Sequence, residues 1–280
     1  MKNKNKLVVV APIIAAAVGF SNTVNAIDVD PLDYVAAPAG VNLAILYAGS
    51  INEHTNLGAD LDANINIARF VAYREFMGIT VDPQILIPFG KQEIAGGALE
   101  ASGFADPILA ATFWFVNDDK NQFGITPFLT VPIGSYDNND SLNLGKNTWE
   151  GTIQAGWVHK PTTNLALEVV TDVTFSTDND DFGPTGERLT KDATFQVQLL
   201  ASYKLSGETT LGVNLSRQWG GDTEVANVVT DGAEITKASI YAQHWIAPTL
   251  QIQGKYSRDL EVDNVPFETQ TFQLRLLKVF

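Results

Sequence analysis

The sequence predicts an all-β protein, a transmembrane up-and-down antiparallel β-barrel of about 12 strands, with 10 and 14 as the alternatives. Three observations lead to this fold. Segments of about 10–13 residues alternate apolar and polar side chains, which is the period of a strand with one apolar and one polar face. The connectors between these segments alternate between short and long. No apolar run after residue 26 could cross a membrane as a helix, and only helices and closed barrels satisfy every backbone group in lipid.

The first 26 residues have the pattern of a cleaved Sec-type signal peptide. Residues 1–6 hold three lysines and no acid, residues 7–20 are almost wholly apolar, and Val24-Asn25-Ala26 is a small-x-small site. A transmembrane anchor is the alternative, but 14 apolar residues rise only about 21 Å as a helix, against a hydrocarbon core of about 30 Å. We therefore expect residues 1–26 to be removed during export.

Residues 27–39 precede the first strand-like segment. Pro31, Pro38 and several aspartates argue against a strand there. Two placements remain open, one in the periplasm and one folded into the barrel mouth. Residues 40–280 are expected to form the barrel itself.

Twelve strand-like segments follow, each long enough for the roughly 9–11 residues that a tilted transmembrane strand requires. The predicted strands are 40–49, 65–76, 79–88, 106–116, 123–133, 149–159, 164–175, 193–204, 208–218, 235–246, 249–258 and 268–280.

The lengths of the connectors indicate the topology. The short ones are 77–78, 117–122, 159–163, 205–208 and 246–249, and the long ones are 50–64, 89–105, 134–148, 176–192, 219–234 and 259–267. Strict alternation is typical of an up-and-down barrel with tight periplasmic turns and long outer loops, and not of a Greek-key sandwich. Both termini are then expected on the periplasmic side, which requires an even number of strands.

Composition narrows the classes of function. The net charge of −14 argues against nucleic acid as a partner, and the absence of cysteine excludes disulfides and thiolate metal sites. A mean hydropathy of +0.02 suits a barrel with a polar interior and hydrophilic loops.

No catalytic or metal-binding constellation is evident. His54, His159 and His244 show no metal-binding spacing, and no G-x-S-x-G motif occurs. Residues 178–183 resemble the start of a calcium loop, but Phe182 stands at a ligand position and Leu189 stands where the bidentate glutamate is needed. We expect no enzyme activity, no cofactor and no metal.

Charged side chains on the polar faces of the strands are the candidate functional residues. If Phe272, Leu274 and Leu276 face lipid, the residues of opposite parity face the lumen. The candidate lumen-lining residues are Arg69, Asp82, Glu168, Asp172, Lys255 and Arg275. They either neutralise one another in a packed interior or line a narrow polar path and set its selectivity.

Tryptophan and tyrosine residues fall toward the ends of the predicted strands. Trp114, Trp149, Trp157, Trp219 and Trp245, with Tyr47, Tyr203 and Tyr256, suit girdles at the two membrane interfaces. The alternative is that aromatic side chains line a route for an apolar solute.

The last strand ends in Phe280, which resembles the C-terminal assembly signal of bacterial outer-membrane barrels. Lys278 departs from that pattern, because an apolar or aromatic residue is usual there. This resemblance implies a Gram-negative outer-membrane location and, as partners, the barrel-assembly machinery, membrane lipid and lipopolysaccharide.

Four groups of residues together resemble one family. They are Asp33-Tyr34 before Pro38-Ala39-Gly40, Gly103-Phe104-Ala105-Asp106-Pro107, Val131-Pro132-Ile133-Gly134-Ser135-Tyr136-Asp137, and Leu144-Gly145 before Trp149. In order and spacing they are similar to the meta-pathway phenol-degradation outer-membrane proteins, a family distantly similar to hydrocarbon and fatty-acid transport barrels. The resemblance runs from about Asp33 to the C-terminus. It implies an outer-membrane barrel associated with the breakdown of aromatic compounds and carries no catalytic residues.

Two functions are compatible with these observations. The first is a porin-like channel for passive uptake of small apolar or aromatic solutes. The second is a closed structural or surface-interaction barrel that acts through long acidic extracellular loops. A soluble periplasmic β-protein is disfavoured by the strand lengths, the alternating connectors and Phe280.

Overall fold

The structure, a computed structural model, describes residues 27–55, 60–94, 96–265 and 267–280. The predicted signal peptide, residues 1–26, lies outside the described residues. Throughout the described ranges the regular secondary structure is β, and no helix there is long and apolar enough to cross a membrane.

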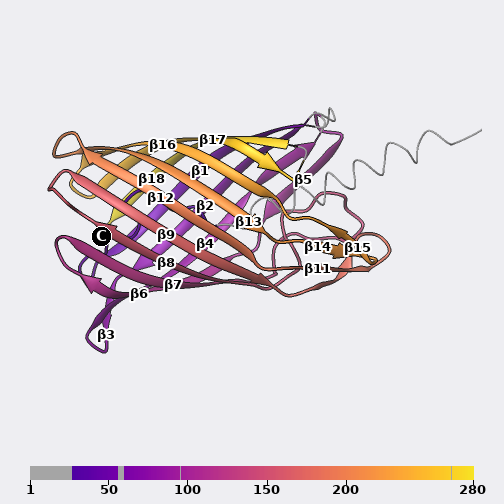
Figure 1. The fold of residues 1–280 in the computed structure, drawn as a ribbon, viewed down its shortest axis with the longest axis horizontal. Coiled ribbons are helices and arrows are strands. Elements are labelled where there is room, and N and C mark those ends of the chain that lie inside the picture. The colour runs from indigo at the N-terminus through magenta and orange to yellow at the C-terminus, as the bar shows by residue number, and fades with distance from the viewer. Residues whose placement is uncertain (1–26, 56–59, 95, 266) are drawn as a thin grey trace, which may run out of the picture.

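Twelve antiparallel strands, each paired with its neighbours in the chain, form a closed barrel within the described residues (Figure 1). They are β1 (Asn42–Thr55), β2 (Leu61–Ala72), β4 (Ile79–Ile94), β6 (Ile108–Asn117), β7 (Asn121–Thr130), β8 (Glu150–His159), β9 (Leu165–Ser176), β12 (Thr194–Lys204), β13 (Thr209–Gly220), β16 (Glu234–Ala247), β17 (Leu250–Asp263) and β18 (Phe267–Val279). The predicted fold class and the predicted number of strands are confirmed.

The first and last strands close the barrel. β1 and β18 pair in continuous register from Leu43 with Val279 to Thr55 with Phe267. Beyond that ladder, the Asn42 N–H donates to the Phe280 carbonyl at 2.9 Å, and the Phe280 N–H donates to the Asn42 carbonyl at 3.0 Å. The terminal phenylalanine therefore completes the hydrogen-bonding of the closing strand pair and leaves neither edge unpaired.

Side chains alternate between the two faces of the wall, as the sequence pattern predicts. On β12, Gln196 and Gln198 are fully buried inside the barrel, whereas Leu199 is 51% exposed on the outer face. Phe272 on β18 is likewise exposed. The outer surface is therefore apolar and the interior polar, the arrangement that a transmembrane barrel requires.

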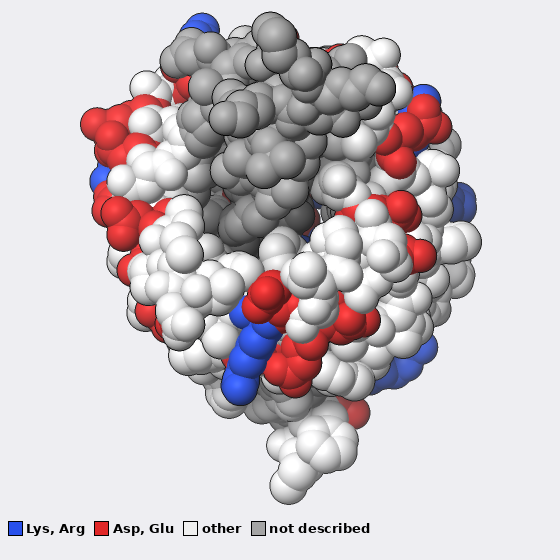
Figure 2. Space-filling view, turned by 90° about the vertical axis from the view of Figure 1, so that its right-hand side faces the viewer, with Lys and Arg blue, Asp and Glu red and all other residues white. Residues whose placement is uncertain are grey.

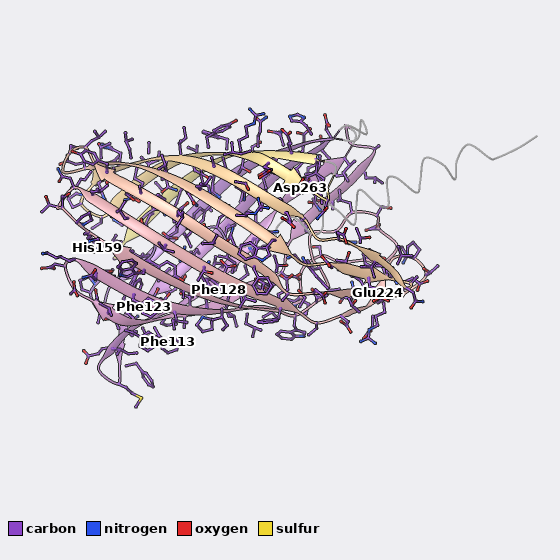
Figure 3. The ribbon with its side chains drawn as sticks, in the orientation of Figure 1. Phe113, Phe123, Phe128, His159, Glu224 and Asp263 are labelled. Atoms are coloured by element: carbon purple, nitrogen blue, oxygen red, sulfur yellow. The ribbon has the colours of Figure 1, made fainter. Side chains whose placement is uncertain are left out.

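The connectors differ at the two ends of the barrel. One end, here the turn end, carries the C-terminus and the short turns, and the other, the loop end, carries the long extensions (Figure 1). In Figure 3, His159 marks the turn end, whereas Glu224 and Asp263 lie at the loop end.

Several connectors predicted as irregular loops contain strands. β5 (Leu99–Phe104) pairs with the extended end of β4, and β10 (Asn179–Phe182), β11 (Glu187–Lys191), β14 (Thr223–Val225) and β15 (Val228–Thr230) form a separate four-stranded sheet at the loop end. β3 (Arg74–Phe76), which falls within the predicted strand 65–76, pairs with β4 at the turn end. The sequence pattern missed the strands at the loop end, because a strand that projects beyond the membrane pairs its backbone without having to present an apolar face to lipid.

Gly90 provides a test of how closely β2 and β4 pack in the wall. A Cβ added at Gly90 would lie 2.1 Å from the Asn64 carbonyl oxygen, so that backbone would have to shift. Gly90→Val should destabilise the folded barrel by an overpacking cost of about 1–3 kcal/mol. The compact, heat-modifiable band on a gel should therefore be lost at a lower midpoint temperature. Gly151→Val on β8 is the control, because a Cβ there meets nothing within 4 Å. Equal midpoints for the two variants would contradict this packing.

Candidate functional site: the occupied barrel interior

Residues 27–39 are here called the inner segment; residues 27–37 lie inside the barrel, and Pro38 and Ala39 are exposed. Val29 and Tyr34 are 5% and 4% exposed, although neither belongs to a strand. A tight turn shapes the segment, in which the Asp33 N–H donates to the Asp30 carbonyl and the Val35 N–H to the Leu32 carbonyl, both at 3.1 Å. Pro31 and the positive φ of Leu32 (68°) suit this turn, and Pro31 and Pro38 disfavour pairing of the segment with the sheet.

Charges of the wall hold the aspartates of the inner segment. Arg275 on β18 lies 2.9 Å from Asp30 and 3.3 Å from Asp33, and Arg69 on β2 lies 3.2 Å from Asp33. Arg275 and Asp30 are both almost fully buried. Removing one partner of such a pair leaves an uncompensated buried charge, which costs about 3–5 kcal/mol.

A second group of ion pairs holds the start of the inner segment. Asp28 lies 3.0 Å from the Lys237 ammonium of β16 and 3.7 Å from the Lys255 ammonium of β17. Gln196 of β12 donates to the same carboxylate at 3.1 Å. The Lys255 ammonium also lies 5.4 Å from the centre of the Tyr241 ring.

The three predicted wall carboxylates accept hydrogen bonds from neutral donors. Glu168 on β9 accepts the Leu32 N–H of the inner segment at 2.9 Å. Asp172, also on β9, accepts from the Gln154 amide at 3.1 Å. Asp82 on β4 accepts the Trp114 indole N–H at 2.8 Å. Of the six predicted candidates, the structure therefore places five in the network around the inner segment, and it ties Asp82 to that network through Trp114.

The interior neutralises its charges in a way that the sequence did not predict. The three predicted cations of the wall, Arg69, Lys255 and Arg275, pair with aspartates of the inner segment. Lys237 and the three aspartates of the inner segment were not among the candidates. Parity could have found Lys237, because it lies on the same face of β16 as the buried Ser239 and Tyr241. Nothing local in the sequence indicates that residues 27–39 lie inside the barrel.

Three of the predicted girdle residues belong to the interior, two of them buried there and the third, Trp245, partly buried against the same cluster. Trp114 and Tyr47 are 2% and 7% exposed and belong to the same buried cluster as Tyr34. They project inward because their positions on β6 and β1 have the inner parity, so the girdle interpretation is wrong for them. Trp149, Trp157, Trp219, Tyr203 and Tyr256 are exposed on the outer face, where the girdle interpretation can apply.

Glycine makes room for the inner segment at two places in the wall. A Cβ added at Gly156 of β8 would lie 2.2 Å from Cγ of Tyr34, and one added at Gly212 of β13 would lie 2.8 Å from Cγ of Pro31. The wall is therefore recessed where two side chains of the segment press against it.

The histidines are dispersed. His54 Nδ1 lies 3.4 Å from Asp60, His159 Nδ1 lies 2.9 Å from Asn121, and His244 Nδ1 lies 2.9 Å from the Thr209 hydroxyl. Across the described ranges, no group of three or more histidine, cysteine, aspartate or glutamate side chains could hold a metal ion. In the loop that resembles a calcium site, Asp178 is paired with Arg188.

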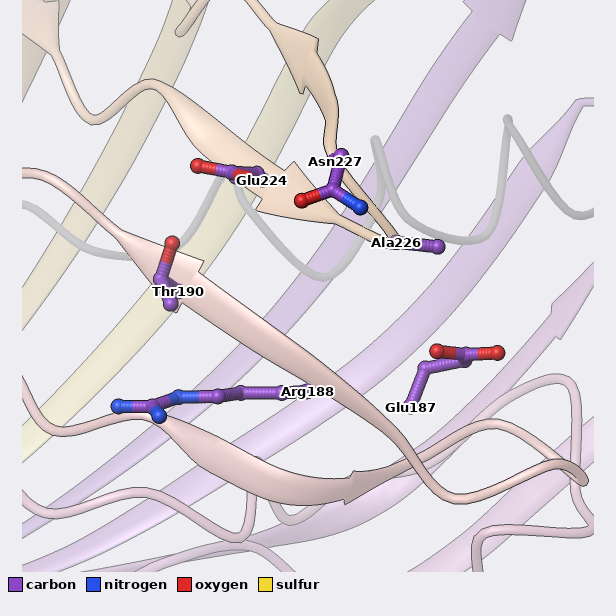
Figure 4. Close-up of a pocket in the computed structure, with 6 residues that line it drawn as sticks. All are labelled: Glu187, Arg188, Thr190, Glu224, Ala226 and Asn227. Carbon is purple, nitrogen blue, oxygen red and sulfur yellow. The ribbon is translucent and has the colours of Figure 1, made fainter.

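The loop end has an acidic rim. Figure 2 looks onto this end and shows Asp and Glu side chains at several places around its margin. Glu187, Glu224 and Asp263 are among the exposed acids there. Figure 4 shows an open pocket of about 300 Å³ on the four-stranded sheet, between Arg188, Thr190 and Asn227 and their neighbours. The pocket is shallow and its side chains are largely exposed, so it offers little enclosure to a ligand.

This chain matches one protein family and is similar to a solved outer-membrane channel. The model of the family described as "Putative MetA-pathway of phenol degradation" matches residues 47–276. The COG4313 outer membrane channel from Pseudomonas putida F1 is 31% identical, with a TM-score of 0.85, and the alignment covers 90% of this chain and 100% of that chain. The comparison with curated proteins found no match.

A more distant solved structure shares the fold alone. The transport unit of the autotransporter AIDA-I from Escherichia coli is 10% identical, with a TM-score of 0.53, and the alignment covers 95% of this chain and 96% of that chain. The family match over most of the chain and the closed 12-stranded barrel lead to one conclusion: this chain is an outer-membrane β-barrel that belongs to the family of MetA-pathway phenol-degradation proteins.

Proposed function

We propose that this protein is a bacterial outer-membrane channel for passive uptake of small apolar or aromatic solutes, and that the inner segment controls the channel. The observation that carries the proposal is that ion pairs and hydrogen bonds hold the inner segment against the polar and aromatic wall of a closed barrel. Membership of a phenol-degradation family and the 31% identity to an outer-membrane channel support the same function.

The proposal includes an orientation and a route of assembly. Residues 1–26 direct export and are then removed, the turn end and both termini face the periplasm, and the loop end faces outward. Short periplasmic turns and long outer loops are the usual arrangement in bacterial barrels. The barrel-assembly machinery then acts on the strand that ends in Phe280, and membrane lipid and lipopolysaccharide surround the apolar outer face.

The inner segment is suited to be a movable barrier. It is joined to the wall by ion pairs and hydrogen bonds, and the chain has no cysteine that could lock it covalently. When it moves aside, the vacated path is lined by buried polar side chains such as Gln154 and Gln198 and by aromatic side chains such as Trp114. Opening the channel breaks the contacts between the inner segment and the wall, so the closed state has the lower free energy. A bound solute or a structural change must supply new contacts before the open state is favoured.

Charge favours neutral or apolar solutes over anions. The chain carries a net charge of −14, and acids surround the loop end (Figure 2). An acidic entrance raises the local concentration of cations and lowers that of anions, but it leaves neutral solutes unaffected. We assign no catalytic role to any residue, and we propose that transport needs no cofactor.

A closed structural or surface-interaction barrel is the second candidate. The filled interior favours it, as does the four-stranded sheet that projects at the loop end (Figure 1). In that function the inner segment would be a permanent core, and the projecting sheet would be the working surface.

Conductance separates the two candidates. In planar bilayers, a variant that lacks residues 28–37 should conduct several times more current than the unaltered protein, because the segment fills the lumen. In liposomes, the unaltered protein should admit neutral aromatic solutes faster than sugars of similar size. Heat-modifiable gel mobility checks that each protein is folded. The channel would be refuted if both folded proteins showed neither conductance nor flux.

Substitution of Arg275 tests how the segment is held. Arg275→Ala leaves Asp30 buried without its closest cation, so exchange of the amides in residues 27–39 should become about a hundredfold faster, corresponding to about 3 kcal/mol. The same substitution should change ion selectivity or solute flux without preventing assembly. Hydrogen exchange by mass spectrometry measures the first effect, and bilayer recordings measure the second.

Two further variants make this test specific. Asp30→Asn in the Arg275→Ala background should restore part of the protection, because it removes the uncompensated charge. Arg217→Ala is the matched control, since Arg217 pairs with Glu234 and Glu261 at the surface and such pairs contribute about 0–1 kcal/mol. Equal exchange in Arg275→Ala and Arg217→Ala would show that the buried pair does not hold the segment.

A further inference from the structure

We infer that the part of the wall now occupied by the Tyr34 side chain is a binding site for a phenol, that is, a single aromatic ring bearing a hydroxyl group. The Tyr34 side chain is itself a phenol, and it fills the site while the inner segment is in place. The inference rests on the proposed function in one respect, because a solute reaches the site only when the segment moves. It adds to that function a location and a chemical rule for selection.

The site has a flat slot for an aromatic ring. Gly156 forms its floor, and a Cβ there would meet three ring carbons of Tyr34 at 2.2–2.4 Å. The Trp114 ring forms one side, with its centre 5.9 Å from that of Tyr34 and an interplanar angle of 63°. An edge-to-face contact of this kind suits any benzene ring. The glycine and the indole together accept a flat ring and exclude a branched aliphatic group.

The site also recognises a hydroxyl group at the far end of the ring. The Tyr34 hydroxyl donates to Gln154 Oε1 at 3.0 Å and lies 3.0 Å from Thr126 Oγ1. Both partners are buried, at 1% and 2% exposure. A buried acceptor left without a donor is costly, so a ring that lacks a hydroxyl group is penalised here.

The orientation of Gln154 makes this recognition directional. Its amide nitrogen donates to the Ile27 carbonyl at 2.9 Å and to the Asp172 carboxylate at 3.1 Å, so the amide oxygen must face the hydroxyl. The bond to Asp172 lies wholly within the wall and remains when the inner segment leaves. The site therefore presents an acceptor and selects a phenol over its methyl ether.

Strand pairing keeps the site in place without the inner segment. Thr126 of β7 stands directly opposite Gln154 of β8, and Gly124 stands opposite Gly156 in the same ladder. The Trp114 indole is held by its hydrogen bond to Asp82. Every group that contacts the Tyr34 ring or hydroxyl in this way belongs to a barrel strand, so the site is preformed.

Tethering explains how one phenol replaces another. Tyr34 is joined to the barrel through a short stretch of chain, which gives it an effective concentration of about millimolar or more at the site. A free phenol at a lower concentration therefore binds poorly until the segment is displaced. Removal of the Tyr34 side chain should expose the site directly, since a cavity of ring size left by a removed side chain can take up a free aromatic molecule.

The test uses the full barrel with Tyr34→Ala in detergent, titrated calorimetrically with phenol, anisole and toluene. Phenol should bind at least about tenfold more tightly than anisole or toluene, because only phenol can donate to Gln154. Gly156→Val added to Tyr34→Ala should abolish phenol binding by filling the floor of the slot. Adding Gln154→Leu instead should remove the preference and leave weak binding of all three.

Tyr47→Ala is the matched control. It removes the same side chain from the same interior, but the Tyr47 hydroxyl accepts from Arg69 Nη1 at 3.2 Å, so its cavity presents a donor and should not prefer phenol over anisole. Equal binding of phenol and anisole by Tyr34→Ala, or no binding at all by the folded variant, would overturn the inference.

Failure of the inference and failure of the channel can be told apart. Calorimetry in detergent measures the site without transport, and liposome flux measures transport without the substitution. Flux through the unaltered protein with no phenol preference in Tyr34→Ala would leave the channel and remove the site. A phenol preference without flux would keep the site and remove the channel.

Discussion

Closure of the sheet between β1 and β18 is the constraint on which the rest of this structure depends. Once these strands pair from Leu43–Val279 to Thr55–Phe267, the wall has no edge and its backbone is satisfied in lipid. Closure also assigns every residue of every strand to an inner or an outer face. Many polar and charged side chains then lie in a small interior beside a buried aromatic cluster, and they need hydrogen-bond and charge partners there.

The inner segment supplies the charge partners for that interior. Asp28, Asp30 and Asp33 enter an interior that contains Arg69, Lys255 and Arg275, so opposite charges meet across a low-dielectric space. Gln154 and Gln198 donate to the Ile27 carbonyl at the start of the segment. Such an arrangement is stable when complete and costly when partly broken. A filled interior of this kind can open cooperatively, because the loss of one hydrogen bond or ion pair weakens the neighbouring ones in the same network.

The proposed channel and the proposed phenol site follow from one property of this filling, which is that the segment is held by contacts rather than by bonds. Ion pairs to Asp30 and Asp33 hold its acidic turn, while the Tyr34 ring lies on Gly156 beside Trp114. A phenolic solute can therefore make the same contacts with the wall that the Tyr34 side chain makes. Occupation of the site and displacement of the barrier would then be two descriptions of one equilibrium.

The sequence by itself determined the barrel, the parity of its strands and the inward orientation of residues such as Arg275 and Lys255, because a period of two and long apolar faces are local properties of the chain. The strand extensions at the loop end escaped it, since strands outside lipid carry no such pattern. Only the tertiary structure decided that residues 27–37 fill the lumen, that Trp114 and Tyr47 face inward, and that Arg275 pairs with Asp30. These contacts join residues up to 245 positions apart, and their partners are set by the closed geometry of the barrel, which no local pattern encodes.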